Sequence, residues 1–182
     1  MNPEPDDAVI RRILSGGRQE FGQLYEAYKD SVYGYCLRLL GDRNAAEDAT
    51  HSTFLKALES IHTLDTPSAF RFWLFTIARN KAYGQIRRTR RNGTTRIAEE
   101  SDEPLDESTP HELASSKELV EIVQSALGKL KAEYREVMIL REYEHLSYSE
   151  IAAVTGDTES SVKSRIFKAR KALTVMLEPF IK

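Results

Sequence analysis

The central segment of the chain limits the fold more than any other feature, because it cannot fold by itself. Residues 92–112 have the sequence NGTTRIAEESDEPLDESTPHE, with two prolines, many Ser and Thr and few apolar side chains. Such a segment buries too little apolar surface to offset the conformational entropy that ordering removes. We therefore predict a flexible acidic linker at residues 92–115, between two small domains at residues 17–91 and 116–180.

Charge changes sign abruptly where this linker begins. Seven Lys or Arg and no acid lie between Arg79 and Arg96, whereas seven Asp or Glu and no Lys or Arg lie between Glu99 and Glu112. The net charge of the whole chain is only -2. Binding to nucleic acid must therefore depend on local basic patches and not on the total charge.

Both domains show helical periodicity and no competing strand pattern, which predicts an all-α fold. In the N-terminal domain, apolar residues recur at helical spacing from Phe21 to Ala78. Gly41 is expected to end one helix and Asp42 to cap the next. Pro67 disfavours helical backbone geometry at Thr66 and predicts a break there. The N-terminal domain is thus expected to be a helical bundle.

The C-terminal domain carries the signals of a helix-turn-helix. Ser147 and Glu150 have capping-box spacing at the start of the short helix YSEIAAV, and Gly156 suits a tight turn after it. Either Asp157 or Thr158 caps the basic helix that follows. A short helix, a turn containing Gly and a second helix with a polar face are typical of helix-turn-helix DNA-binding domains.

The final helix, TESSVKSRIFKARKAL, is basic and amphipathic. Its apolar stripe consists of Val162, Ile166, Ala169, Leu173 and Leu177. Hydroxyl groups, ammonium groups and one aromatic ring face away from that stripe: Ser160, Ser161, Ser164, Phe167, Lys168 and Lys171. These are groups that bind phosphates and base edges, so the helix is predicted to contact DNA.

Several other chemistries are not expected. Cys36 is the only cysteine and lies in an apolar run, and the four histidines show no metal-ligand spacing, so we expect no disulfide, no metal and no cofactor. The acids of the linker lack the rigid support that an active site needs, so the chain is not expected to be an enzyme. The sequence shows no secretory signal and no apolar stretch of about 20 residues, which predicts a cytoplasmic protein without membrane insertion.

Three motifs together resemble bacterial RNA polymerase sigma factors, most closely the compact extracytoplasmic-function group. These motifs are FGQLYEAYKDSVYGYCLRLLGDRNAAED, FRFWLFTIARNKA and EYREVMILREYEHLSYSEIAAVTG with SSVKSRIFKARKAL. The resemblance covers nearly the whole chain apart from about the first dozen residues and the linker. It implies a factor that binds RNA polymerase core and recognises the −10 and −35 elements of promoter DNA. It also implies that an anti-sigma factor can bind between the two domains.

The resemblance also implies roles for individual residues. The −35 element is expected to contact Arg141, Tyr148, Ser161, Lys163, Ser164, Phe167 and Lys168, of which four also belong to the outward face of the final helix. The −10 element is expected to contact Arg79, Asn80, Lys81, Gln85, Arg87 and Arg88. A loop at residues 62–68 is expected to capture a flipped base, and Trp73 either joins it or belongs to the core. Polymerase is expected to contact Glu47, Asp48, Thr53 and Phe54.

Two departures from the family pattern bear on these roles. The polymerase-binding helix commonly contains EDLVQETF, whereas this chain has EDATHSTF, with Ala49, Thr50, His51 and Ser52 at the differing positions. In the −10 helix, Gly84 and Gln85 replace a frequent Asp–His pair. Two other functions therefore stay open at this point: a stand-alone helix-turn-helix regulator, and an adapter that binds acidic protein partners.

Overall fold

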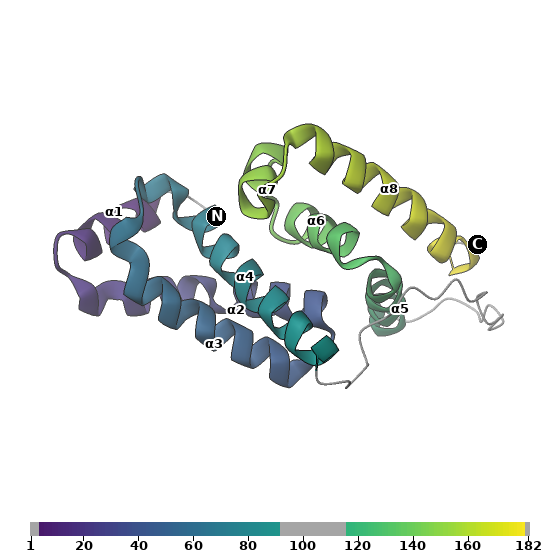
Figure 1. Ribbon diagram of the computed structural model, residues 1–182, viewed down its shortest axis with the longest axis horizontal. Coiled ribbons are helices and arrows are strands. Elements are labelled where there is room, and N and C mark those ends of the chain that lie inside the picture. The colour runs from purple at the N-terminus through teal and green to yellow at the C-terminus, as the bar shows by residue number, and fades with distance from the viewer. Residues whose placement is uncertain (1–3, 92–115, 181–182) are drawn as a thin grey trace.

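The protein is helical throughout the part of the chain that the structure describes. The computed structural model describes residues 4–91 and 116–180 (Figure 1), and no strand occurs among them. The predicted all-α fold class is confirmed. The predicted linker at residues 92–115 lies outside the described residues.

The N-terminal lobe contains four helices. They are α1 (Glu4–Leu14), α2 (Phe21–Leu40), α3 (Arg43–Ser60) and α4 (Phe70–Arg91), with short 3-10 turns η1 (Arg18–Glu20), η2 (Ile61–Thr63) and η3 (Pro67–Ala69). Helices α2, α3 and α4 pack against one another. Helix α1 lies outside the predicted domain of residues 17–91. It buries Val9, Ile10 and Ile13 and contacts α2 and η3.

The reversal between α2 and α3 forms as the sequence predicts. Gly41 ends α2 with a φ of 70°, in the left-handed region that favours glycine. The carboxylate of Asp42 then accepts a hydrogen bond of 2.8 Å from the backbone N–H of Ala45. At the other end of α3, Thr66 has extended backbone angles before Pro67. These local signals set the lengths of the three central helices.

The C-terminal lobe also contains four helices. They are α5 (Ser116–Lys129), α6 (Ala132–Glu142), α7 (Tyr148–Thr155) and α8 (Glu159–Leu177), followed by the 3-10 turn η4 (Glu178–Phe180). Ser147 and Glu150 form the predicted capping box, and Gly156 ends α7 with a φ of 72°. Thr158 caps α8, because its hydroxyl accepts a hydrogen bond from the Ser161 N–H, whereas Asp157 forms an ion pair with Arg165.

The two lobes pack directly against each other. Figure 1 shows α4 beside the C-terminal lobe, where it contacts α7, while α2 contacts both α5 and α6. One continuous cluster of buried apolar residues extends through both lobes. Helices α2 and α4 therefore serve two purposes, since they build the N-terminal bundle and also support the C-terminal lobe.

Candidate nucleic-acid interface

Helix α8 presents a polar face to solvent. Its inner face is fully buried at Val162 and Ala169 and nearly so at Ile166, as the periodicity predicts. On the opposite face Ser164 and Lys168 are exposed, and 71% of Phe167 is accessible to solvent. Phe167 is thus the most exposed of the large hydrophobic side chains in the described residues.

Three of the predicted −35 residues meet at one corner of the helix-turn-helix. The guanidinium carbon of Arg141 in α6 lies 5.0 Å from the ring centre of Tyr148 in α7, and Nζ of Lys163 in α8 lies 5.8 Å from the same ring centre. Nη1 of Arg141 also donates a hydrogen bond of 2.8 Å to the Leu146 carbonyl. The ring thus holds two cations close together at the start of α8, within cation–π distance.

The predicted −10 residues of α4 do not all share one environment. Asn80, Arg87 and Arg88 are exposed, whereas Lys81 and Gln85 are half-buried. Arg79 differs, because its side chain is directed at the C-terminal lobe and Nε lies 2.9 Å from Oε1 of Glu136 in α6. In this arrangement of the lobes, Arg79 is therefore occupied by a protein carboxylate.

The loop predicted to capture a base is exposed except at its anchor. Leu64 is buried, while His62, Thr63, Asp65, Thr66 and Ser68 are open to solvent. Trp73 is half-buried, with its ring centre 5.9 Å from that of the buried Phe70. This packing agrees with a position for Trp73 at the edge of the core.

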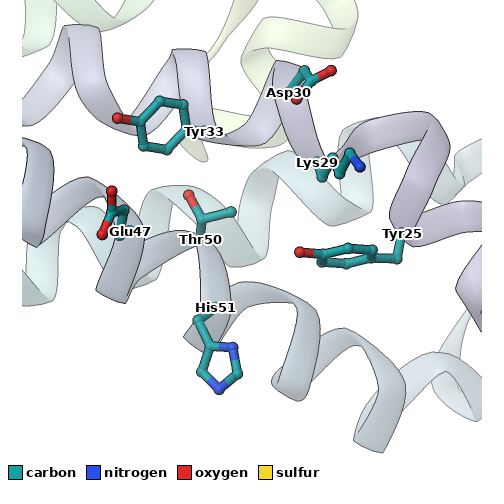
Figure 2. A pocket seen from close by; sticks show the side chains of 7 residues that line it. All are labelled: Tyr25, Lys29, Asp30, Tyr33, Glu47, Thr50 and His51. Carbon is teal, nitrogen blue, oxygen red and sulfur yellow. The ribbon is translucent and has the colours of Figure 1, made fainter.

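A hollow of about 330 Å³ lies between α2 and α3 (Figure 2). Its lining is polar and aromatic, with Tyr25, Lys29, Asp30 and Tyr33 from α2 and Glu47, Thr50 and His51 from α3. Of the four predicted polymerase-binding residues, Glu47 lines this hollow, and Asp48, the next residue of α3, is exposed. Thr53 and Phe54 are buried, so their side chains support this face from within.

The departures in the motif EDATHSTF change the exposed surface less than the sequence suggests. Ala49 is buried, and the hydroxyl of Thr50 donates a hydrogen bond of 2.7 Å to the Ala46 carbonyl within α3. Ser52 is half-buried, and His51 is exposed at the hollow. The surface difference is therefore concentrated at His51.

Sequence reasoning missed the charged residues that lie between the lobes. Residues 135–140 of α6 are all buried, including Arg135 and Glu136, and Glu144 is buried just after this helix. The one sequence signal of this burial is the run REVMIL at residues 135–140, in which four consecutive apolar residues follow the two charges. Such a run covers every side of a helix with apolar groups, which is typical of a helix that is buried all round.

No group of three His, Cys, Asp or Glu side chains among the described residues is arranged to hold a metal ion. Within the same residues, no helix is both long enough and apolar enough to cross a membrane.

Comparison with known proteins decides the family. The sequence model of Sigma-70 region 2 matches residues 24–92, and that of Sigma-70 region 4 matches residues 121–173. The chain is 30% identical over 176 residues to the ECF RNA polymerase sigma factor SigW of Bacillus subtilis, which covers 92% of this chain and 94% of that protein. The chain belongs to the extracytoplasmic-function group of RNA polymerase sigma factors. As a sigma factor it binds RNA polymerase and directs promoter-specific initiation of transcription.

Two more relatives span this sigma factor almost completely. The RNA polymerase sigma-H factor of Pseudomonas aeruginosa is 31% identical over 190 residues, covering 100% of this chain and 98% of that one. The sigma factor RpoE of Bartonella quintana, solved in complex with the anti-sigma factor NepR, has a TM-score of 0.71 at 29% identity, covering 88% and 98% of the two chains. A stand-alone regulator and an adapter are set aside, since neither explains a sigma region 2 ahead of the helix-turn-helix.

Proposed function

We propose that this sigma factor divides promoter recognition between its lobes. Helix α8 enters the major groove of the −35 element, while α4 and the loop at residues 62–68 bind the −10 element as a separated strand. The face around the α2–α3 hollow binds polymerase core. Each contact is weak alone, and mounting both lobes on one polymerase raises the effective concentration of the second contact.

The exposed face of α8 carries the −35 proposal. Ser164, Phe167 and Lys168 are spaced i, i+3 and i+4, so they lie on one side of the helix, opposite the buried Val162 and Ile166. In a helix-turn-helix the second helix places such residues against base edges, and cations at its start contact phosphates. The Arg141–Tyr148–Lys163 corner supplies those cations.

The composition of α4 supports single-strand binding at −10. Arg87 and Arg88 are exposed for phosphates, and Asn80 and Gln85 offer amide groups to base edges. Flipping a base out of the stack costs a few kcal/mol, so the protein must offer a pocket and hydrogen bonds in return. The exposed hydroxyl and carboxylate groups of residues 62–68 lie beside α4 and can form those bonds.

The polymerase surface combines exposed acids with a rigid aromatic support. Glu47 and Asp48 project from α3, and the buried ring of Phe54 packs edge-to-face on Tyr25, with ring centres 4.8 Å apart. Phe54 thereby holds Tyr25 at the hollow. Two acids, Asp30 and Glu47, outnumber the single cation Lys29 in the lining of this aromatic hollow, which suits a basic surface of the polymerase.

The remaining parts of the proposal follow from this role. The chemistry of RNA synthesis belongs to polymerase, so the chain acts without catalysis, and it acts in the cytoplasm, where polymerase meets the promoter. The relative from Bartonella quintana is described in complex with an anti-sigma factor, which supports the proposal that such an inhibitor also binds this chain.

Transcription with purified core polymerase tests the −35 proposal. Fragments of the genome that encodes the chain serve as template, and sequencing of RNA 5′ ends identifies start sites. Lys163→Ala and Lys168→Ala are each expected to lower initiation about tenfold, the size of a lost DNA contact. Lys129→Ala, exposed at the end of α5, is the matched control. Normal initiation by both lysine variants of α8 would show that this face does not contact DNA.

Gel filtration with core polymerase tests the α2–α3 surface separately. Glu47→Lys and Asp48→Lys reverse charges beside the hollow and are expected to weaken the complex. Glu59→Lys, an exposed acid near the end of the same helix, is expected to leave it unchanged. If all three variants co-elute with core polymerase to the same extent, the polymerase contact lies elsewhere.

A further inference from the structure

Glu136 of α6 is a fully buried carboxylate whose polar partners all belong to the other lobe. Its Oε1 accepts a hydrogen bond of 3.0 Å from the hydroxyl of Tyr35 in α2. Its Oε2 accepts one of 2.9 Å from the hydroxyl of Tyr83 in α4, and Nε of Arg79 lies 2.9 Å from Oε1. Glu136 therefore does not stabilise its own lobe, because each of these contacts requires the N-terminal lobe to be docked.

Other charged groups at the same boundary also contact across it. Nη1 of Arg135 donates a hydrogen bond of 2.9 Å to the Leu39 carbonyl, and Arg71 donates one to the Glu144 carbonyl. The guanidinium of Arg38 stacks over the ring of Tyr143 at 4.0 Å from its centre. These groups regain water when the lobes separate, so a boundary built on them is more easily opened than a purely apolar one.

Arg79 is only partly satisfied in this closed form. Its Nε is buried and makes no hydrogen bond to any described residue, so the 2.9 Å contact with Glu136 is an ion pair without hydrogen-bond geometry. A DNA phosphate offers the guanidinium two oxygens in a matching plane. The same side chain can therefore serve Glu136 or a phosphate, but not both at once.

We propose that the free protein is autoinhibited by a closed form in which Glu136 holds the two lobes together and withholds Arg79 from DNA. The proposal rests on the proposed function, since it takes Arg79 as a contact to the −10 strand. Binding to DNA or polymerase must then supply the free energy that separates Glu136 from its partners. The apparent affinity of the free chain for DNA is then the affinity of the open form multiplied by the fraction of chains that are open.

Energy transfer between the lobes tests the closed form without DNA or polymerase. Dyes are attached to the full chain at Gln23→Cys in α2 and Lys171→Cys in α8, both exposed positions, while native Cys36 is fully buried. Glu136→Ala removes the acceptor of the Tyr35 and Tyr83 hydroxyls and leaves Arg79 without its carboxylate partner, so it is expected to lower the transfer efficiency. Glu133→Ala, at an exposed acid one turn earlier on α6, is expected to leave the transfer efficiency unchanged.

Binding to a labelled single-stranded 20-mer of mixed sequence tests the withholding of Arg79. Glu136→Ala is expected to tighten binding about tenfold, the gain expected if about a tenth of the free chain is open. Adding Arg79→Ala to Glu136→Ala is expected to abolish that gain. Tyr83→Phe, which removes one hydroxyl donor to Glu136, is expected to act in the same direction by a smaller factor and guards against a folding defect.

Two outcomes would overturn the proposal. One is unchanged energy transfer in folded Glu136→Ala and Tyr83→Phe, which would show that Glu136 does not hold the lobes. The other is lower transfer with unchanged affinity for the 20-mer, which would show that Arg79 is not withheld. Neither measurement uses core polymerase. A failure of the proposed function would appear in the transcription assay, whereas a failure of the closed form would appear only in energy transfer or in binding to the 20-mer.

Discussion

The hydroxyl of Tyr35 in α2 donates a hydrogen bond of 3.0 Å to Oε1 of Glu136 in α6, a residue 101 positions away. Both side chains are fully buried. The ring of Tyr35 also packs edge-to-face on Phe75, with ring centres 5.5 Å apart, inside the N-terminal lobe. One tyrosine thus joins the core of the first lobe to the charged boundary of the second.

The closed form should depend on pH in a direction set by Glu136. Burial raises the pKa of this carboxyl above its ordinary value of 4.5, and the charge of Arg79 and the hydroxyls of Tyr83 and Tyr35 oppose the rise. The closed form then binds a proton more tightly than the open form. The part of the closed form's stability that comes from protonation of Glu136 is complete below pH 4.5 and is lost as pH rises through the raised pKa. The hydrogen bonds that Glu136 accepts from Tyr35 and Tyr83 remain possible in both protonation states.

Energy transfer between the labelled lobes, measured from pH 4 to 8, checks this expectation. Transfer should fall as pH rises, and Glu136→Ala should lack the part of the fall that Glu136 contributes. Burial also raises the pKa of Glu144, in contact with Arg71, so a step in the same direction should persist in the variant. Superimposable curves for the two proteins would contradict the assignment to Glu136.

Val162→Asp should unfold the C-terminal lobe. Val162 is fully buried on the inner face of α8, so the new carboxylate has neither water nor a cation to compensate it. The expected loss is about 3–5 kcal/mol in the free energy of unfolding, measured by urea denaturation with circular dichroism. Val175→Asp, on the same helix but 58% exposed, is the control, and an equal loss there would argue against the burial of this face.

Gly84→Ala should stabilise the protein. Gly84 lies inside α4, and a Cβ placed there meets no heavy atom within 4 Å, so the substitution gains helix propensity of up to about 1 kcal/mol without a clash. Gly41→Ala has the same open space but a φ of 70°, so it should destabilise by about 1 kcal/mol. Urea denaturation of both variants checks the pair, and shifts of the same sign would refute the argument.

Cys36 should be unreactive in the folded protein. Its side chain is fully buried and burial raises its pKa to about 12, so almost no thiolate forms at pH 8. Ellman's reagent is expected to react only as fast as the N-terminal lobe opens, and at once after unfolding in urea. Ser164→Cys, at an exposed position of α8, supplies the fast-reacting reference. Rapid reaction of native Cys36 would contradict its packing.

Local signals in the sequence were sufficient for the end of α2, the start of α3 and both ends of α7. Gly41, Asp42, Ser147 and Gly156 each do in the structure what their residue types predict, because capping and turn geometry involve neighbours within four positions. Whether Asp157 or Thr158 caps α8 was decided only by the folded structure, since both side chains can cap a helix and only their surroundings differ.

Predictions of burial and of helices failed where tertiary packing decides the outcome. Tyr25 and Leu55 fit the helical apolar pattern of α2 and α3, yet they are 40% and 50% exposed, beside the proposed polymerase surface. Helix α1 went unpredicted, although Val9, Ile10 and Ile13 have helical spacing. The roles of the individual site residues and the limits of the two domains stay predictions.

The sequence by itself determined an all-α chain, its capped turns, the family and the outward face of α8, because each depends on residues close together along the chain. Only the tertiary structure decided that Arg79 contacts Glu136 and that the polar Thr53 is buried. Glu136 lies 53 positions from Tyr83 and 101 from Tyr35, and a carboxylate destined for such partners is indistinguishable in sequence from one that faces water. Its role arises only when two amphipathic lobes dock and exclude solvent from the charges between them.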